Sequence, residues 1–123
     1  MSLQHIRLEL AREADAPHGD PGDGYDLVVM LDDQARLDAP ALLAAPERTR
    51  VRRFRDGETL AVGQLTQGSD GRWLLDFPGE DSDAVGFRLE DERFVAGEYV
   101  SLAEPGGRMR PYRVAVVNPL DQP

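Results

Sequence analysis

A chain of 123 residues in which 41% are hydrophobic and 30% are charged can bury one continuous core, so residues 1–123 are expected to form a single domain. The net charge of −9 argues against wholesale adsorption to nucleic acid or anionic lipid, because both are bound mainly by neutralising their phosphates. The absence of cysteine excludes disulfides, cysteine-ligated metals and thiol nucleophiles.

The first ten residues, MSLQHIRLEL, lack the basic start and continuous apolar run of a secretory signal. No apolar run approaches the roughly 20 residues needed to cross a membrane as a helix. The sequence therefore predicts a cytoplasmic protein with no membrane segment.

Two strands are predicted in the first third of the chain, separated by an exposed, adaptable loop over 13–24. Apolar and polar residues alternate over 3–12 and again over 25–31, as in half-buried strands that can pair across the loop. The residues expected to face the core are Ile6, Leu8 and Leu10 in the first strand and Tyr25, Leu27, Val29 and Leu31 in the second.

One short helix is predicted in the segment LDAPALLAAPERT. Asp38 can cap its free amides, Pro40 suits a first turn, and Pro46 stops it after about two turns. The helix is too short to organise the fold.

The remainder of the chain predicts two hairpins with another strand between them. Segment 59–65 pairs with 72–78, and 97–104 pairs with 109–117, while 84–90 forms the intervening strand. The expected inward-facing residues are Trp73, Leu75 and Phe77, then Val85, Phe87 and Leu89, then Tyr112, Val114 and Val116.

These elements predict a mainly β protein, a small antiparallel β-barrel of SH3-like or related type. It has about seven or eight short strands and one short helix. A barrel is preferred to a sandwich because closure removes exposed strand edges.

The segment RTRVRRFRDGE, residues 48–58, is the best candidate for a functional site, because it concentrates five arginines in an acidic chain. On a strand, Val51 and Phe54 would point to opposite faces, so a bulge or bend is expected near Arg52 and Arg53. A bulge would aim those two guanidiniums outward together, as suits a carboxylate or phosphate. The predicted ligand-binding residues are Arg50, Arg52, Arg53 and Arg55.

The alternative interpretation is that these arginines pair with acidic residues of the same chain, which helps to set strand register. Residues 13–38 carry eight acids against one arginine. They are Glu13, Asp15, Asp20, Asp23, Asp26, Asp32, Asp33 and Asp38.

Other kinds of site find little support. The acids and His18 of the first loop do not have the spacing of a calcium loop, and neither histidine lies in a known catalytic motif. Phe54 is the only aromatic residue inside the arginine cluster, which disfavours a nucleic-acid surface. We predict no catalytic residue, no metal site and no cofactor, and an enzyme is not favoured.

Two segments share a pattern, FRDGETL at 54–60 and FVAGEYV at 94–100. Each precedes a predicted hairpin. A structural half-repeat is one interpretation, and independent use of a glycine turn before a strand is the other.

The runs VRRF…GE, VGFRLEDERFVAGEYVSL and YRVAVVNPL, with the strand HIRLELAR, resemble a family of short β-rich bacterial proteins with no established activity. The resemblance implies a bacterial source and carries over no functional residue. FVAGEYVSL…YRVAVV is also similar to a strand entry of SH3-like barrels, which implies a β-barrel and no function.

The preferred hypothesis is a noncatalytic binding module that uses the arginine-rich strand surface for an acidic protein or small anionic partner. A second hypothesis is a homodimer in which the arginine segment of one copy meets the acidic segment of the other. A third is an enzyme acting on a small anionic substrate.

Overall fold

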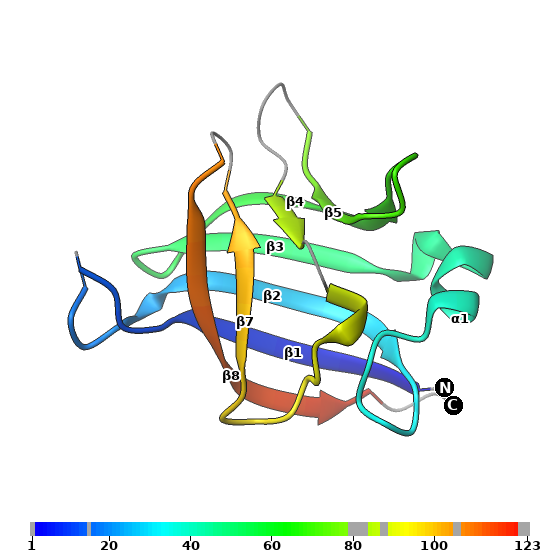
Figure 1. The fold of residues 1–123 in the computed structure, drawn as a ribbon, viewed down its shortest axis with the longest axis horizontal. Helices are drawn as coiled ribbons and strands as arrows, with labels where there is room; N and C mark the ends of the chain where they lie inside the picture. Colours follow the sequence, from blue (N-terminus) through cyan, green and yellow to red (C-terminus); the bar gives the residue numbers. More distant parts are fainter. Residues whose placement is uncertain (1, 15, 79–83, 87–88, 105–106, 121–123) are drawn as a thin grey trace.

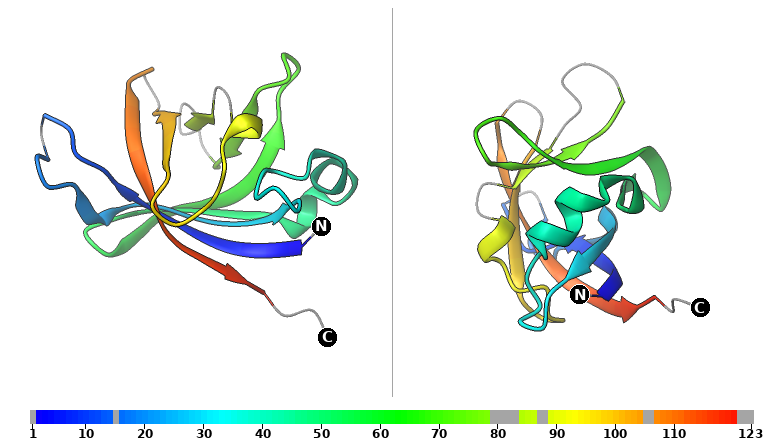
Figure 2. Two further views of the ribbon diagram at one scale, coloured as in Figure 1. Left: turned by 60° about the horizontal axis from the view of Figure 1, so that its bottom comes forward. Right: turned by 90° about the vertical axis from the view of Figure 1, so that its right-hand side faces the viewer.

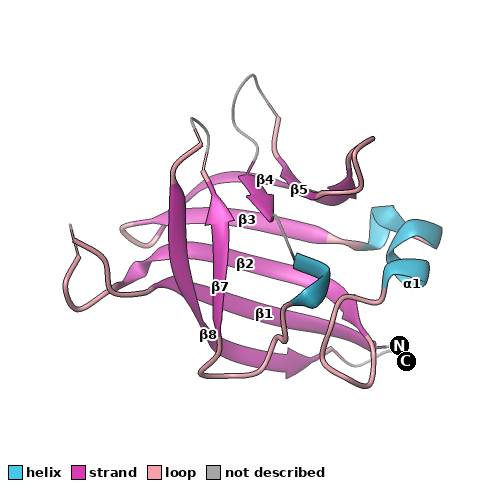
Figure 3. Cartoon of the chain, in the orientation of Figure 1, coloured by secondary structure: helices cyan, strands magenta, loops and turns pink. Residues whose placement is uncertain are grey.

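The computed structural model describes residues 2–14, 16–78, 84–86, 89–104 and 107–120. Strands dominate this part of the chain (Figures 1 and 3). In chain order the elements are β1 (Ser2–Leu10), β2 (Asp20–Leu31), α1 (Ala39–Ala44), a 3-10 helix (Pro46–Arg48), β3 (Arg50–Arg55), β4 (Glu58–Gln67), β5 (Trp73–Asp76), β6 (Ala84–Gly86), a second 3-10 helix (Leu89–Asp91), β7 (Tyr99–Ala103) and β8 (Met109–Pro119).

Each strand pairs antiparallel with the next along the chain, and β8 pairs with β1 to close the barrel. The β6–β7 junction consists of a single residue pair, Val85 with Ala103. The longest strands are β1, β2, β4 and β8, and the sheet that they form with the shorter strands is strongly curved (Figure 2). The prediction of a mainly β, small antiparallel barrel with one short helix is confirmed, with eight strands in the described residues.

Strands β1 and β2 form as predicted, and their expected core residues are buried. The prediction of a loop reaching residue 24 is wrong, because β2 already begins at Asp20. A register shift lets Leu10 pair with Asp20 and Glu9 with Gly24. Glycine is needed at position 24, since a Cβ there would lie 1.9 Å from the carbonyl oxygen of Leu8. Glycine at position 24 therefore lets the backbones of β1 and β2 come close together, and β2 continues back to Asp20.

Helix α1 has the predicted cap, with the Asp38 side chain accepting a hydrogen bond from the backbone N–H of Ala41 at 3.2 Å. Pro40 lies in its first turn, and Pro46 begins the 3-10 helix that follows.

Both predicted hairpins are present, as β4–β5 and β7–β8. Of the strand predicted over 84–90, β6 covers Ala84–Gly86, and residues 87–88, including Phe87, lie outside the described residues. The prediction is wrong at Leu89 and Glu90, which belong to a 3-10 helix in which Leu89 is buried. An apolar residue three positions beyond a strand can also reach the core from a helical turn.

The prediction that Val116 faces the core is also wrong. Strand β8 shifts register against β1, so that Leu8 pairs with Val114 but Ile6 pairs with Val117. Ala115 is the extra residue of this bulge, and Val117 packs on the core in place of Val116. A bulge reverses the alternation because the side-chain period of a strand is two residues.

The two similar segments share their glycine turns and differ in what the phenylalanine does. Gly57 and Gly97 both have positive φ, at 78° and 96°. Phe94 belongs to the core cluster, whereas Phe54 is buried outside it. The half-repeat stays a prediction.

The core fills the barrel interior with side chains from most of the strands. Its largest fully buried members include Trp73, Tyr25, Tyr112, Phe94, Ile6, Leu8, Leu27, Leu42, Leu65, Leu75 and Leu89. Two of these, Tyr25 and Tyr112, carry hydroxyl groups that need partners, and they lead to the polar end of the barrel.

Candidate functional site

The arginines of segment 48–58 are divided between the two faces of the barrel wall. Strand β3 pairs with β2 in regular register over its described length, so its side chains alternate. Val51 and Arg53 are buried on the inner side, Phe54 is buried on the outer side, and Arg50 is exposed. The consecutive residues Arg52 and Arg53 therefore point in opposite directions.

The expectation that a bulge or bend in β3 aims Arg52 and Arg53 outward together is wrong. The register shift lies between β3 and β4, where Arg53 pairs with Ala61 and Phe54 with Thr59, so Leu60 of β4 is the extra residue. Both Val51 and Phe54 are nevertheless buried, because arginine side chains cover the outer face as well. The guanidinium carbon of Arg7 lies 4.3 Å from the Phe54 ring centroid, and that of Arg52 lies 5.2 Å from it.

On the outer face Asp26 collects the charged groups around Phe54. Its carboxylate accepts hydrogen bonds from Arg52 Nη1 at 2.5 Å and pairs with His5 Nε2 at 2.9 Å. Arg52 Nε also donates to the Thr59 hydroxyl at 2.6 Å. Arg52, a predicted ligand-binding residue, is thus held by its own chain.

On the inner face Arg53 makes the most buried ion pair of the described residues. Its Nη1 donates to Asp23 Oδ1 at 2.5 Å, and the two side chains are only 9% and 8% exposed. The same nitrogen donates to the carbonyl oxygens of Phe54 and Gly24. No described residue accepts a hydrogen bond from Nη2, which lies 3.8 Å from Glu104 Oε1. One edge of this guanidinium is therefore fixed and the other is open.

Glu104 joins the arginines to two buried tyrosines. The Tyr25 hydroxyl donates to Glu104 Oε2 at 2.7 Å, and the Tyr112 hydroxyl donates to Glu104 Oε1. The two rings meet edge to face, with centroids 5.2 Å apart. The carboxylate of Glu104 thus holds two tyrosines, of which Tyr25 lies 79 positions away in the sequence and Tyr112 lies 8 positions away.

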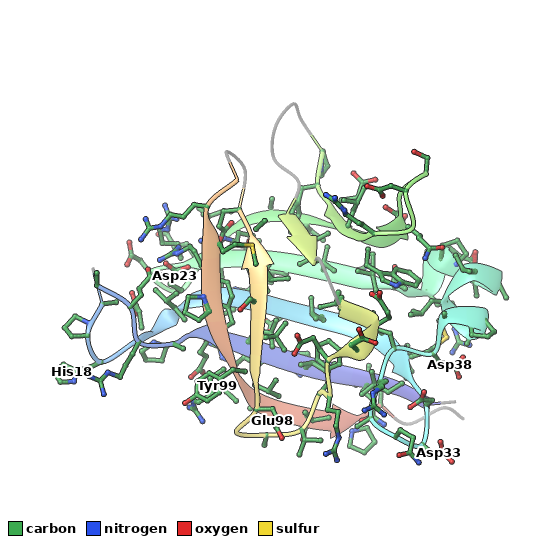
Figure 4. All side chains as sticks on the ribbon, viewed as in Figure 1. His18, Asp23, Asp33, Asp38, Glu98 and Tyr99 are labelled. Atoms are coloured by element: carbon green, nitrogen blue, oxygen red, sulfur yellow. The ribbon has the colours of Figure 1, made fainter. Side chains whose placement is uncertain are left out.

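Arg110 closes the other side of this arrangement. Its Nη2 donates to Glu13 Oε1 at 2.7 Å, and its Nη1 lies 3.5 Å from Asp23 Oδ2. Because neighbouring strands are antiparallel, this end of the barrel brings together the ends of β1, β3 and β7 and the starts of β2 and β8. Asp23 is labelled in this region in Figure 4. We call the set the barrel-end network: Glu13, Asp23, Tyr25, Arg53, Glu104, Arg110 and Tyr112.

Burial fixes the protonation of the tyrosines in this network. Desolvation, followed by the nearby Glu104 carboxylate, raises the pKa of Tyr25 far above its usual value. The pKa of Tyr112 is raised for the same reasons, with the hydrogen bond to Glu104 ahead of its charge. Both hydroxyls therefore remain hydrogen-bond donors at neutral pH.

The arginines respond to two opposing effects. Burial by itself lowers the pKa of Arg53, but the interactions with Tyr25 and Asp23 outweigh it and raise the pKa. In Arg110 the hydrogen bond to Glu13 likewise overcomes desolvation, so its pKa is raised. Both guanidiniums keep their positive charge.

A cavity of about 310 Å³ opens beside this network, and we call it the barrel-end cavity. Arg53 and Arg55 supply positive charge, Tyr25 and Glu104 a polar wall, and Leu60, Ala61 and Phe77 an apolar wall. The Arg55 side chain is 52% exposed, and its only carboxylate contact in the described part of the chain is Asp23, at 3.8 Å. Leu60 is 55% exposed, although it is a large apolar side chain. The volume is at the small end of the range for ligand sites.

Of the eight acids in residues 13–38, three pair with arginine side chains: Glu13, Asp23 and Asp26. Asp20 accepts a hydrogen bond from the backbone N–H of Gly22 in β2, and Asp32 and Asp38 accept from backbone amides of a turn and of α1. Asp15 lies outside the described residues. The ion pairs of the alternative interpretation are thus present for Arg52, Arg53 and, at 3.8 Å, Arg55. A binding role for Arg50, Arg52, Arg53 and Arg55 stays a prediction.

Sequence reasoning missed four members of the network: Tyr25, Glu104, Arg110 and Tyr112. Alternation along the strands predicts Tyr25 and Tyr112 as core-facing residues. A signal was available, since a tyrosine hydroxyl at a core-facing position needs a polar partner when it is buried.

Among the described residues, no group of three or more histidine, aspartate or glutamate side chains is arranged to hold a metal ion. None of the helices in that part of the chain is long and apolar enough to span a membrane. Comparisons with family models, curated proteins and solved structures find no match.

Proposed function

We propose that the protein is a noncatalytic, cytoplasmic binding module that holds a small organic anion in the barrel-end cavity. The observation that carries this proposal is the pair of arginines beside an apolar wall. Arg53 and Arg55 line the cavity with guanidinium groups that have open N–H donors, and Leu60 and Phe77 line it with apolar surface.

The arrangement favours a monoanion with an apolar body. A carboxylate can accept hydrogen bonds from two guanidiniums, and charge-assisted bonds of this type are the strong ones. Glu104 lies in the same wall and opposes additional negative charge. An aromatic or branched carboxylic acid meets both conditions.

Preorganisation supports a binding role. The side chain of Arg53 is fixed through Nη1 by three acceptors, so little side-chain entropy is lost when Nη2 meets a ligand. Tyr25 and Tyr112 keep their protons and hold Glu104, which suits them to positioning and not to proton abstraction.

The homodimer receives less support from the structure. The acids that a second copy would offer include Asp23 and Asp26, and both are paired with arginines of their own chain. Homodimerisation stays a prediction that sedimentation at low salt can test.

Titration of ¹⁵N-labelled protein with benzoate tests the proposal. We expect amide shifts at Leu60, Ala61 and Phe77, with weaker binding of acetate because it lacks a ring. Arg55→Gln should weaken benzoate binding about tenfold or more, as expected for loss of a charged hydrogen bond. Arg50→Gln is the matched control, since Arg50 is also an exposed arginine of β3 and does not line the cavity.

The proposal fails if 10 mM benzoate, a concentration of the order of weak-ligand Kd values, shifts none of these amides. It also fails if the Arg50 and Arg55 variants lose affinity equally. An acidic peptide that shifts the same amides when benzoate does not would replace the small anion with an acidic protein as the ligand.

A further inference from the structure

A second cavity lies on the outer surface of the barrel, and we call it the outer groove. Its volume is about 380 Å³, and its lining includes Glu9, Arg12, His18, Asp20, Tyr99 and Arg113. It shares no lining residue with the barrel-end cavity. An inference about the outer groove therefore stands apart from the proposed function.

The floor of the outer groove is a row of outward-facing residues on three adjacent strands. Glu9 of β1 pairs with Arg113 of β8, and Arg113 pairs with Tyr99 of β7. The neighbours of Arg113 along β8, Tyr112 and Val114, are buried in the core, so Arg113 itself points outward. The register of the barrel thus places a carboxylate, a guanidinium and a phenol side by side.

The wall of the groove is the segment between β1 and β2, which is held by backbone hydrogen bonds. Glu13 and Ala16 exchange two hydrogen bonds of 3.0 and 3.1 Å, and Gly19 N–H donates to Ala16. Arg7 Nη2 donates to the carbonyl of Pro21 at 3.0 Å. Figure 4 shows His18 on this loop and Tyr99 at the start of β7.

The carboxylates of the groove accept hydrogen bonds, whereas its basic side chains donate none within the described residues. Glu9 accepts a hydrogen bond from Arg7 at 2.8 Å, and Asp20 accepts one from Gly22 N–H at 2.9 Å. Arg113 comes no closer than 3.8 Å to Glu9.

Arg12 and His18 have no hydrogen-bond or ion-pair partner among the described residues. Three nitrogen-bearing side chains from two parts of the fold therefore surround one space with donors available.

Tyr99 is the other unusual feature of the groove. It is 61% exposed, more than any other large hydrophobic side chain in the described residues. Packing of the barrel does not require it, because Val100 and Leu102 supply the buried face of β7. An exposed aromatic ring beside cations offers a stacking surface.

We propose that the outer groove binds a phosphate monoester carried on a planar ring. The ring stacks on Tyr99, and the phosphate lies between Arg12 and Arg113 with His18 as a further donor. A phosphate monoester presents three terminal oxygens, which match three donor groups better than the two oxygens of a carboxylate. The volume accommodates a ring and one phosphate, and Glu9 and Asp20 oppose a more highly charged ligand.

The test compares three probes in ¹⁵N-labelled protein at pH 7: phenyl phosphate, inorganic phosphate and phenol. We expect phenyl phosphate to shift the amides of Gly19, Tyr99 and Arg113 and to bind about five- to tenfold more tightly than inorganic phosphate, as an aromatic contact provides. Tyr99→Ala should remove that difference. Arg12→Gln and Arg113→Gln should each lower the affinity about fivefold or more.

Arg50→Gln again serves as the exposed-arginine control and should leave the affinity unchanged. The substituted side chains Arg12, Tyr99 and Arg113 are exposed, so the variants are expected to fold, and circular dichroism checks this.

Equal affinities for phenyl phosphate and inorganic phosphate would overturn the proposal, as would full binding by the Arg12 and Arg113 variants. Shifts confined to Leu60 and Ala61 would also overturn it, because the ligand would then occupy the barrel-end cavity. Failure of benzoate to bind that cavity leaves the outer groove unaffected, so the two proposals fail separately.

Discussion

Replacing Arg53 with methionine isolates the energetic role of the buried ion pair. Methionine keeps much of the length of the side chain and removes its charge, so Asp23 loses the hydrogen bond at 2.5 Å while remaining 8% exposed. Breaking a buried pair from one side costs about 3–5 kcal/mol, because the remaining charge is left uncompensated. Arg110 stays 3.5 Å from Asp23 and offsets part of the loss, so about 3 kcal/mol is expected.

Urea denaturation measures this change directly, and calorimetry gives a second value. At about 2.1 cal/mol/K per residue, a chain of 123 residues unfolds with an entropy of about 260 cal/mol/K, so 3 kcal/mol lowers the Tm by about 12 °C. The Asp23→Asn substitution should lower the free energy of unfolding of the Arg53→Met variant less than it lowers that of the unsubstituted protein. The expected difference is about 1.5 kcal/mol or more. A loss below about 1 kcal/mol, or strict additivity, would refute a strongly coupled buried pair.

Stability should fall at alkaline pH, since the pKa values of Tyr25 and Tyr112 are raised above that of an unfolded tyrosine, mainly by burial. The contribution of the two neutral tyrosines to the free energy of unfolding is complete below about pH 10. Above that pH it is lost by about 1.4 kcal/mol per pH unit for each tyrosine. Urea midpoints measured between pH 8 and 11 check this, and a flat profile would contradict it. Gly24→Ala should destabilise by about 3 kcal/mol or more, because the new Cβ would lie 1.9 Å from the Leu8 carbonyl oxygen. Gly57→Ala, with φ of 78° and no atom within 4 Å of the added Cβ, should cost only about 1–2 kcal/mol, and equal losses in thermal melts would exclude the steric explanation.

The barrel can be predicted from the local alternation of apolar and polar residues in the sequence. Alternation over β1, β2 and β5 predicts their buried faces correctly, because the extra residues of the register shifts lie outside these predicted segments. Val116 shows where this reasoning stops. A single extra residue at Ala115 shifts the register against β1, and no local pattern distinguishes this bulge from a regular strand.

The candidate site was less accessible from the sequence. The excess of arginine in 48–58 and of acid upstream predicts that the two segments meet, but it does not say which arginine turns inward. Regular pairing with β2 decides that Arg53 points to the interior and Arg52 to the outside. Glu104 and Arg110 enter from the other end of the chain, at a separation that only the closed barrel defines.

Closure of the barrel has a consequence for the order in which the protein matures during synthesis. The contacts that complete the polar end join residues far apart, with Arg110 97 positions from Glu13 and Glu104 79 positions from Tyr25. Pairings of such long range form late, because the chain between them must first lose its freedom. A nascent chain that stops before β8 can build β1 to β4 and still lack Arg110 and Tyr112, which hold Glu13 and Glu104. The barrel-end network is therefore complete only when the last strand has paired.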